Sequence, residues 1–166
     1  MGKTAGLVII GNEILSGKVQ DANAPFFALA LRELGVDLRR IAVVPDDVVV
    51  IAAEVRAFSR AFDVVCTSGG VGPTHDDVTI EAVAHAFGRR VVRDPGLERV
   101  LREFYRNRVT QAHLKMAEVP EGAELVGRET LLFPVIACRN VYIFPGIPEI
   151  LRQKFHAIQE RFRDTP

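Results

Sequence analysis

The sequence of 166 residues has few cysteines, no surplus of charge of either sign and no long hydrophobic run. Its 21 Lys and Arg residues balance 21 Asp and Glu residues, which gives a formal net charge of zero. This balance argues against non-specific nucleic-acid binding, because displacing counterions from phosphates requires a strong cationic surplus. The two cysteines, Cys66 and Cys138, lie in apolar, strand-like runs and show no spacing suited to zinc. We expect both to be buried thiols in a reducing compartment.

The lack of a long apolar run also bears on export and on membranes. After Lys3, the apolar segment 5–10 is too short for a signal peptide or a membrane span, so we expect a cytoplasmic protein that contacts no membrane. The chain is 48% hydrophobic and shows no repeat, low-complexity tract or linker. Its length and composition predict one domain, residues 1–166, that buries a core.

The most informative stretch is residues 63–88, where an apolar run leads into a glycine-rich loop and then into a helical pattern. The run 64–66 does not alternate, as expected of a strand buried on both faces. In the loop 68–73, three glycines in four positions leave no Cβ between the backbone and a ligand. Residues 78–87 have helical spacing, and Gly88 is placed to end the helix. A strand, a glycine loop and a helix start gather unpaired N–H groups into an anion site.

Two aspartates, Asp76 and Asp77, follow this anion-binding loop. Carboxylates beside a phosphate repel it unless a divalent cation stands between them, so the pair indicates Mg²⁺ or a similar hard ion. The alternative is that Asp77 or Thr79 only caps the following helix, since acidic residues are common in first turns. The loop alone leaves both interpretations open.

Strand and helix patterns alternate through the first 88 residues, which predicts a parallel sheet with right-handed crossovers. The expected strands are 6–10, 36–44 and 64–66, and the expected helices are 23–34, 48–61 and 78–87. Ligands of such sheets bind outside the carboxyl ends of the strands. Asn12 and Glu13 follow the first strand, so we expect them to face the glycine loop, although Glu13 also fits a solvated loop charge. Asp46 lies in an acidic turn at the end of the second strand. Asn23 is placed to cap a helix.

The second half of the sequence is less regular. Arg99, Arg102 and Arg106 share one helix face, which is more often solvated than bound to an anion. Lys115 lies on a second short helix, and Pro134 places part of the hairpin at an edge or bulge. The expected elements are an edge strand at 89–93, helices at 94–108 and 112–117, a turn at 118–122, a hairpin of 131–138 and 141–144, and a final amphipathic helix after Pro148.

Three segments carry a resemblance to a known family. Residues 68–79, which read SGGVGPTHDDVT, resemble the signature loop of the molybdopterin-binding (MoaB/Mog-like) fold. Residues 11–15 (GNEIL) and 139–149 (RNVYIFPGIPE) resemble two further signatures of one branch. That branch holds the N-terminal domain of the competence/damage-inducible protein CinA and the molybdopterin-binding-like domain of FAD synthase. The motifs occur in the expected order, so the similarity covers essentially the whole chain.

The resemblance implies an α/β fold with three α/β/α layers, a mostly parallel sheet and a small β-hairpin subregion. It also implies a homo-oligomer, a dimer or a trimer. In members that adenylylate molybdopterin, an aspartate after the second strand and one before Val-Thr act around metal and phosphate, which correspond here to Asp46 and Asp77. The CinA and FAD synthase branch is associated with divalent-metal-dependent cleavage of pyrophosphates such as ADP-ribose or FAD. The further catalytic domains of its longer members have no counterpart in residues 1–166.

These inferences predict a metal-dependent pyrophosphatase for a dinucleotide or nucleotide-sugar diphosphate. Asp77, Asp46 and Glu13 are the expected catalytic residues, with Glu13 positioning the attacking water. Asp77, Asp76 and Asp46 are the expected ligands of Mg²⁺, Mn²⁺ or Co²⁺. His75 is either a proton donor or a structural loop residue. The expected substrate-binding residues are Ser68, Gly69, Gly70, Gly72, Thr74, Lys115, Pro145 and Gly146, with the glycine amides on the diphosphate and Lys115 as a counter-charge.

Two other functions are compatible with the same residues. The first is a non-catalytic module that binds a nucleotide or a pterin, with molybdopterin as a ligand. The second is adenylyl transfer to molybdopterin, which the signatures at 11–15 and 144–148 make the less favoured of the two.

Overall fold

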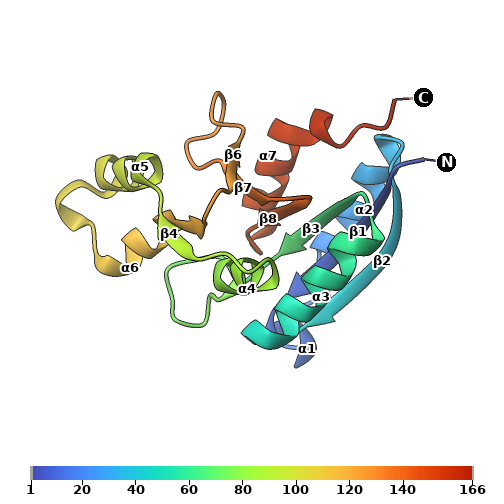
Figure 1. Ribbon diagram of the computed structural model, residues 1–166, viewed down its shortest axis with the longest axis horizontal. Helices are drawn as coiled ribbons and strands as arrows, with labels where there is room; N and C mark the ends of the chain where they lie inside the picture. Colours follow the sequence, from blue (N-terminus) through green and yellow to red (C-terminus); the bar gives the residue numbers. More distant parts are fainter. Residues whose placement is uncertain (1, 166) are drawn as a thin grey trace.

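A computed structural model describes residues 2–165, and its centre is one sheet of six strands in the order β2–β1–β3–β8–β7–β6 (Figure 1). Neighbours from β2 to β8 run parallel, whereas β7 and β6 join in antiparallel pairs. This arrangement confirms the predicted mostly parallel α/β fold. The strands are β1 (Thr4–Ile10), β2 (Asp37–Val44), β3 (Val64–Ser68), β6 (Glu124–Val126), β7 (Val135–Cys138) and β8 (Val141–Phe144).

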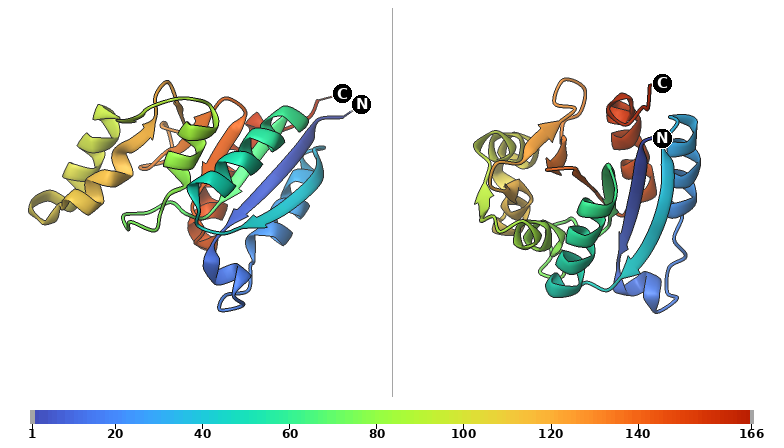
Figure 2. Two further views of the ribbon diagram at one scale, coloured as in Figure 1. Left: turned by 60° about the horizontal axis from the view of Figure 1, so that its bottom comes forward. Right: turned by 45° about the vertical axis from the view of Figure 1, so that its right-hand side comes forward.

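Helices cover both faces of the sheet, as the right-hand view of Figure 2 shows. One face packs against α3 (Val48–Ala61) and α4 (Thr79–Ala86), and the other against α2 (Asn23–Glu33) and α7 (Pro148–Ile158). Strand β1 serves both cores because successive side chains point to opposite faces: Val8 lies in the core with α3, and Leu7 in the core with α2. The predicted three-layer α/β/α arrangement is therefore confirmed.

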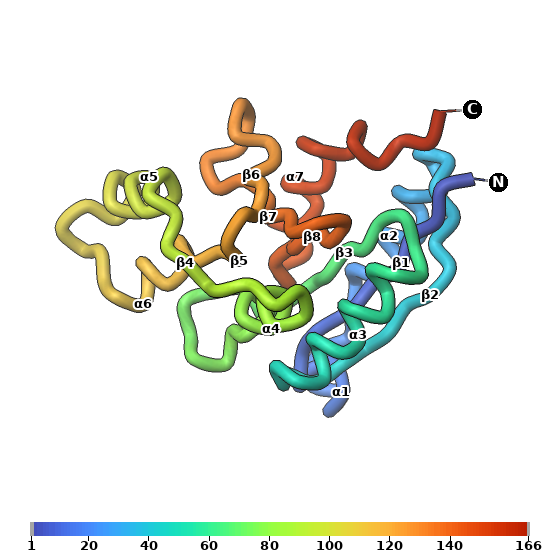
Figure 3. The backbone as a smooth tube through the Cα atoms, in the orientation of Figure 1, coloured from blue at the N-terminus to red at the C-terminus, as the bar shows by residue number. Residues whose placement is uncertain are grey.

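Residues 89–122, which we call the arm, extend beyond α4 at the left of Figures 1 and 3. The arm contains β4 (Val91–Arg93), α5 (Pro95–Tyr105), α6 (Gln111–Leu114) and β5 (Glu118–Pro120), with 3-10 turns at Arg106–Arg108 and Lys115–Ala117. Strands β4 and β5 pair with each other in a separate antiparallel sheet. The predicted edge strand at 89–93 is thus not at an edge of the main sheet, and the predicted turn at 118–122 is partly a strand. Three-residue strands are too short to show alternation.

Other boundaries differ from the sequence-based prediction for local reasons. The β7–β8 hairpin is confirmed, but β7 begins at Val135 rather than Leu131, since Pro134 has no N–H group to donate to a ladder. Residues Asn12–Leu15 form a short helix, α1, where a loop was expected. Helix α5 ends at Tyr105 instead of continuing to Arg108, because Arg106 adopts a left-handed φ of 53°.

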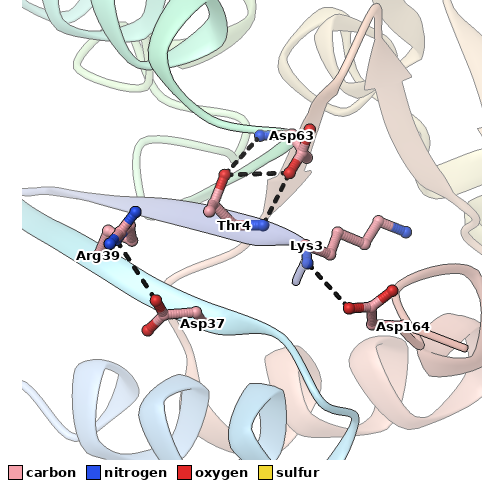
Figure 4. Close-up of polar contacts among 6 residues, drawn as sticks. All are labelled: Lys3, Thr4, Asp37, Arg39, Asp63 and Asp164. Atoms are coloured by element: carbon pink, nitrogen blue, oxygen red, sulfur yellow. Dashed lines mark hydrogen bonds and ion pairs between the residues drawn. The ribbon is translucent and has the colours of Figure 1, made fainter. Parts of the chain in front are cut away.

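The end of the sheet at which β1 begins is held by hydrogen bonds to its neighbours (Figure 4). The carboxylate of Asp63 accepts from the Thr4 backbone N–H at 2.8 Å and from the Thr4 hydroxyl at 3.1 Å, and these bonds lower the pKa of Asp63. The backbone N–H of Lys3 donates to Asp164 at 2.9 Å, which joins the first strand to the C-terminal segment. The carboxyl ends of the parallel strands lie at the opposite end of the sheet, where the strands lead into the loops that form the candidate site.

Two expectations from composition concern the cysteines and the membrane. Cys66 and Cys138 are free and buried, as predicted, and burial raises the pKa of both thiols. None of the helices within residues 2–165 combines the length and the apolarity needed to span a bilayer.

The glycine loop between β3 and α4 passes very close to the backbone of β1. Gly69 has a φ of 101°, and a Cβ at that position would lie 2.2 Å from the carbonyl oxygen of Ile10. Gly70 has a φ of 68°, and its Cβ would lie 2.1 Å from the hydroxyl of Thr79. Both positions therefore require glycine for their φ and for their contacts.

We predict that Gly70→Ala destabilises the protein by roughly 2–4 kcal/mol, from the left-handed φ and the displaced Thr79 hydroxyl. Gly88→Ala is the matched control, since Gly88 also has a positive φ, 64°, but a Cβ there meets nothing within 4 Å. The free energy of unfolding of that variant should fall by only about 1–2 kcal/mol. Urea unfolding measures both, and equal losses would contradict the close contact at Gly70.

Lys154 on α7 provides a prediction about pH, because burial lowers its pKa from 10.5 to about 8. Between these two values the unfolded chain binds more protons than the folded chain, so the free energy of unfolding rises with pH in this window. Lys154→Met should remove this rise and add on the order of 1–3 kcal/mol of stability at pH 7. Chemical unfolding at pH 7 and at pH 10 tests this, and a less stable variant at pH 7 would show the prediction to be wrong.

Candidate functional site

The loops that follow β1, β2, β3 and β8 meet at the carboxyl ends of these parallel strands, where three adjoining hollows open. Gly70 and Asp77 line all three. The acidic pocket, of about 450 Å³, lies toward Asp46, and the apolar pocket, of about 460 Å³, lies toward Ile147. The arm pocket, of about 310 Å³, lies toward Lys115. Together they form one branched crevice with the glycine loop at its junction.

The acidic pocket brings together the carboxylates that the sequence predicted. Glu13, Asp46, Asp76 and Asp77 come from three different loops and line the same hollow, together with Lys18. Two of these loops are tied directly to each other: Asp46 accepts from the backbone N–H of Asn12 at 3.1 Å, and the Asn12 side chain accepts from the Asp46 N–H at 3.1 Å. Asn12 was expected to face this crevice but was given no role in it, and Lys18 was not predicted, because a polar loop residue resembles an ordinary solvated one.

Asp77 is held by its own loop and does not cap the helix. Its Oδ2 accepts from the backbone N–H of Thr74 at 3.0 Å and from the Thr74 hydroxyl at 2.8 Å. Helix α4 begins at Thr79, and Val78 precedes it without a side-chain cap. The Thr79 hydroxyl donates to Gly69 at 2.9 Å. The capping interpretation is therefore wrong for both residues, and Oδ1 of Asp77 has no donor within residues 2–165.

The carboxylates do not form a preformed metal cage. Within residues 2–165, no three His, Cys, Asp or Glu side chains are grouped closely enough to hold a metal ion. The expectation that Asp77, with Asp46 or Asp76, holds a cation stays a prediction. Magnesium, however, is usually held by one or two carboxylates together with substrate phosphates. Acidic side chains lining one pocket also repel a diphosphate unless a cation screens them. These donors fit a cation that binds together with a diphosphate.

The amides of the glycine loop differ in their availability. The N–H of Gly69 donates to the carbonyl of Phe144 at 3.1 Å, so this amide is already bonded within the protein, although Gly69 lines the apolar pocket. The N–H groups of Gly70, Val71 and Gly72 have no protein acceptor within residues 2–165. These three consecutive amides are therefore available to bind an anion.

Asn23 connects three of the loops around the apolar pocket. Its Nδ2 donates to the Ser68 hydroxyl at 2.8 Å and to the Gly146 carbonyl at 2.9 Å, and the side chain is buried. It does not cap α2 as predicted, because Asp21 instead accepts from the N–H groups of Asn23 and Ala24. Ser68 and Gly146 line the apolar pocket, as Asn23 does.

The remaining predicted residues lie at the rim or outside the three hollows. Lys115 lines the arm pocket, and its ammonium donates to the carbonyls of Thr74 and Asp77. Thr74 and Pro145 line none of the hollows, although Thr74 braces Asp77. His75 is exposed and pairs with Asp76 at 3.3 Å. Arg99 and Arg102 of α5, and Arg106 just after its end, also line none of the three hollows, as expected of solvated residues.

The sequence is similar to those of known proteins along nearly its whole length. A family model described as a probable molybdopterin binding domain matches residues 6–163. An Archaeoglobus fulgidus protein is 39% identical over 156 residues, which cover 94% of this chain and 67% of that protein. A probable FAD synthase of Caenorhabditis briggsae is 36% identical and is matched over 96% of this chain and 35% of its own length. A CinA-like protein of Mycolicibacterium gilvum is 37% identical over 91% of this chain and 37% of its own.

Solved structures show the same fold. The protein CinA from Thermoplasma acidophilum, whose function is described as unknown, superposes with a TM-score of 0.88 at 31% identity, covering 97% of this chain and 99% of that one. MoaB from Thermus thermophilus, a molybdopterin biosynthesis enzyme, superposes with a TM-score of 0.57 at 22% identity, covering 93% and 88%, and this likeness concerns the fold alone.

The matched relatives are mostly longer than this chain, which spans about a third of the FAD synthase and of the CinA-like protein. The family model nevertheless covers nearly all of residues 1–166, and the predicted resemblance to both groups of relatives is confirmed. The chain belongs to the molybdopterin-binding domain family.

Proposed function

We propose that this chain is a divalent-metal-dependent pyrophosphatase that cleaves a dinucleotide or nucleotide-sugar diphosphate of the ADP-ribose or FAD type. The observation that carries the proposal is the junction at Gly70 and Asp77. There, three backbone amides without a protein acceptor, which suit a diphosphate, adjoin the acidic pocket. The carboxylates of that pocket repel a diphosphate unless a cation lies between them.

The branched shape of the crevice matches the three parts of such a substrate. The diphosphate fits the junction, where the amides of Gly70, Val71 and Gly72 are available. The apolar pocket, lined by Ile14 and Ile147 among others, suits a flat heterocyclic base. The arm pocket is left for the second half of the molecule. The relatives named FAD synthase support a flavin or adenine dinucleotide as the substrate class.

Each side chain of the junction has a role in this proposal. Asp77, through its free Oδ1, and Asp46 hold the cation beside the diphosphate, and Asp76 adds negative charge at the rim. Such a cation, once held by these carboxylates, would neutralise charge on the phosphates and lower the pKa of a nearby water. Glu13 lines the same pocket and accepts the proton of the attacking water. The water oxygen bonds to one phosphorus while the bond from that phosphorus to the bridging oxygen breaks, which releases AMP and a second phosphate monoester.

We predict that the purified protein releases AMP from ADP-ribose or FAD in the presence of Mg²⁺, Mn²⁺ or Co²⁺, as measured by chromatography. Asp77→Asn and Asp46→Asn should lower turnover by about 100-fold or more, because asparagine keeps the hydrogen bonds of each side chain but loses the charge that holds the cation. The matched control is Asp47→Asn. Asp47 is the neighbour of Asp46, lines none of the three hollows and caps α3, which asparagine does equally well.

Three outcomes would contradict the proposal. Full turnover by Asp77→Asn would show that the mechanism is wrong. No AMP with any metal, together with a raised melting temperature on adding ligand, would favour the non-catalytic nucleotide or pterin module. Conversion of molybdopterin and ATP to the adenylylated product would instead favour adenylyl transfer. Gel filtration of the same sample tests the homo-oligomer that the resemblance predicts.

A further inference from the structure

Lys115 is the residue that ties the arm to the loop carrying Asp77. It begins the 3-10 turn Lys115–Ala117 and is half-buried. Its ammonium donates to the carbonyl oxygen of Thr74 and, at 2.8 Å, to that of Asp77. Hydrogen bonds from a charged donor are stronger than neutral ones, and two of them fix both ends of a four-residue turn. The sequence predicted a direct counter-charge to the substrate, whereas the structure shows the ammonium bound to the protein backbone.

These two hydrogen bonds determine the direction in which the neighbouring amides point. No peptide bond within residues 2–165 is cis. In a trans peptide the C=O and the following N–H point in opposite directions. Since Lys115 holds the Thr74 and Asp77 carbonyls, the N–H groups of His75 and Val78 are directed away from it. Neither of these two amides has a protein acceptor within the part of the chain that the structure describes.

The turn also separates two branches of the crevice. Lys115 lines the arm pocket on one side, Asp76 lines the acidic pocket on the other, and Asp77 borders both. The free amides of the turn and the Asp77 carboxylate therefore belong to the part of the loop that Lys115 holds in place.

We propose that Lys115 is a positioning residue that holds the turn from Thr74 to Asp77, so that the Asp77 carboxylate stays at the junction of the crevice, beside the bound diphosphate. The role toward substrate rests on the proposed pyrophosphatase function. The role toward the turn stands on the two hydrogen bonds and is measurable in the ligand-free protein.

The test compares the parent with Lys115→Met, Lys115→Arg and the control Lys154→Met, which removes another partly buried lysine outside the crevice. Amide hydrogen exchange of the ligand-free proteins is followed at Thr74, Asp77 and Thr79, whose N–H groups are bonded within this loop region. We expect Lys115→Met to exchange at least tenfold faster there and Lys115→Arg to recover most of the protection, since its guanidinium also reaches two acceptors. The control should exchange no faster than the parent.

Kinetics on ADP-ribose with Mn²⁺ provide the second readout. Loss of positioning should lower kcat by 10- to 100-fold with a smaller change in KM, and Lys115→Arg should restore most of it. A raised KM with unchanged exchange would show that Lys115 is instead a direct phosphate contact, and unchanged exchange and kinetics would overturn the proposal altogether. If the parent releases no AMP, the pyrophosphatase function fails, while the exchange data still decide whether Lys115 holds the turn.

Discussion

The close approach of the glycine loop to the end of β1 is the contact on which the crevice depends. Gly69 lies against the Ile10 carbonyl, donates its N–H to Phe144 and accepts from Thr79, so one residue joins three parallel strands and α4 at one point. A side chain at Gly69 or Gly70 would separate these elements, because the neighbouring atoms are backbone or a bonded hydroxyl. The loop is consequently held where its next three amides have no protein acceptor within residues 2–165, which leaves them available to an anion at the carboxyl end of the sheet.

Electrostatics then determine what that site accepts. The amides attract an anion, yet the same junction is bordered by carboxylates that repel it. A divalent cation and a diphosphate that bind together would use both kinds of group, since the phosphates would bond to the amides and the cation to the carboxylates. Either ligand alone would bind to only one of the two. The absence of a three-carboxylate cage within residues 2–165 agrees with this account, because substrate oxygens complete the coordination of such a cation. One lysine lies in each of two branches, Lys18 in the acidic pocket and Lys115 in the arm pocket.

The parts of the fold that follow from local chemistry could be predicted from the sequence. The strand, glycine loop and helix at 63–88 and the helix Val48–Ala61 combine a periodic apolar pattern with glycine or aspartate at their ends, and the structure has them where expected. Predictions failed where a residue's partner lies far away in the chain. Asn23 looks like a helix cap until Ser68 and Gly146 are placed beside it, and the Gly69 amide looks free until Phe144 is paired with it. Short strands such as β4 form only because β5 lies alongside, and no local pattern encodes that pairing.

The account's central claim is that a diphosphate and a divalent cation bind this crevice as a unit. The most direct measurement is calorimetric titration of Mn²⁺ into the protein, alone and with the ADP-ribose analogue whose bridging oxygen is replaced by a methylene group, which cannot be hydrolysed there. The account predicts weak Mn²⁺ binding alone and binding at least tenfold tighter with the analogue, and it predicts that Asp77→Asn abolishes the enhancement. Equally tight Mn²⁺ binding in both titrations, or no effect of the analogue, would contradict it.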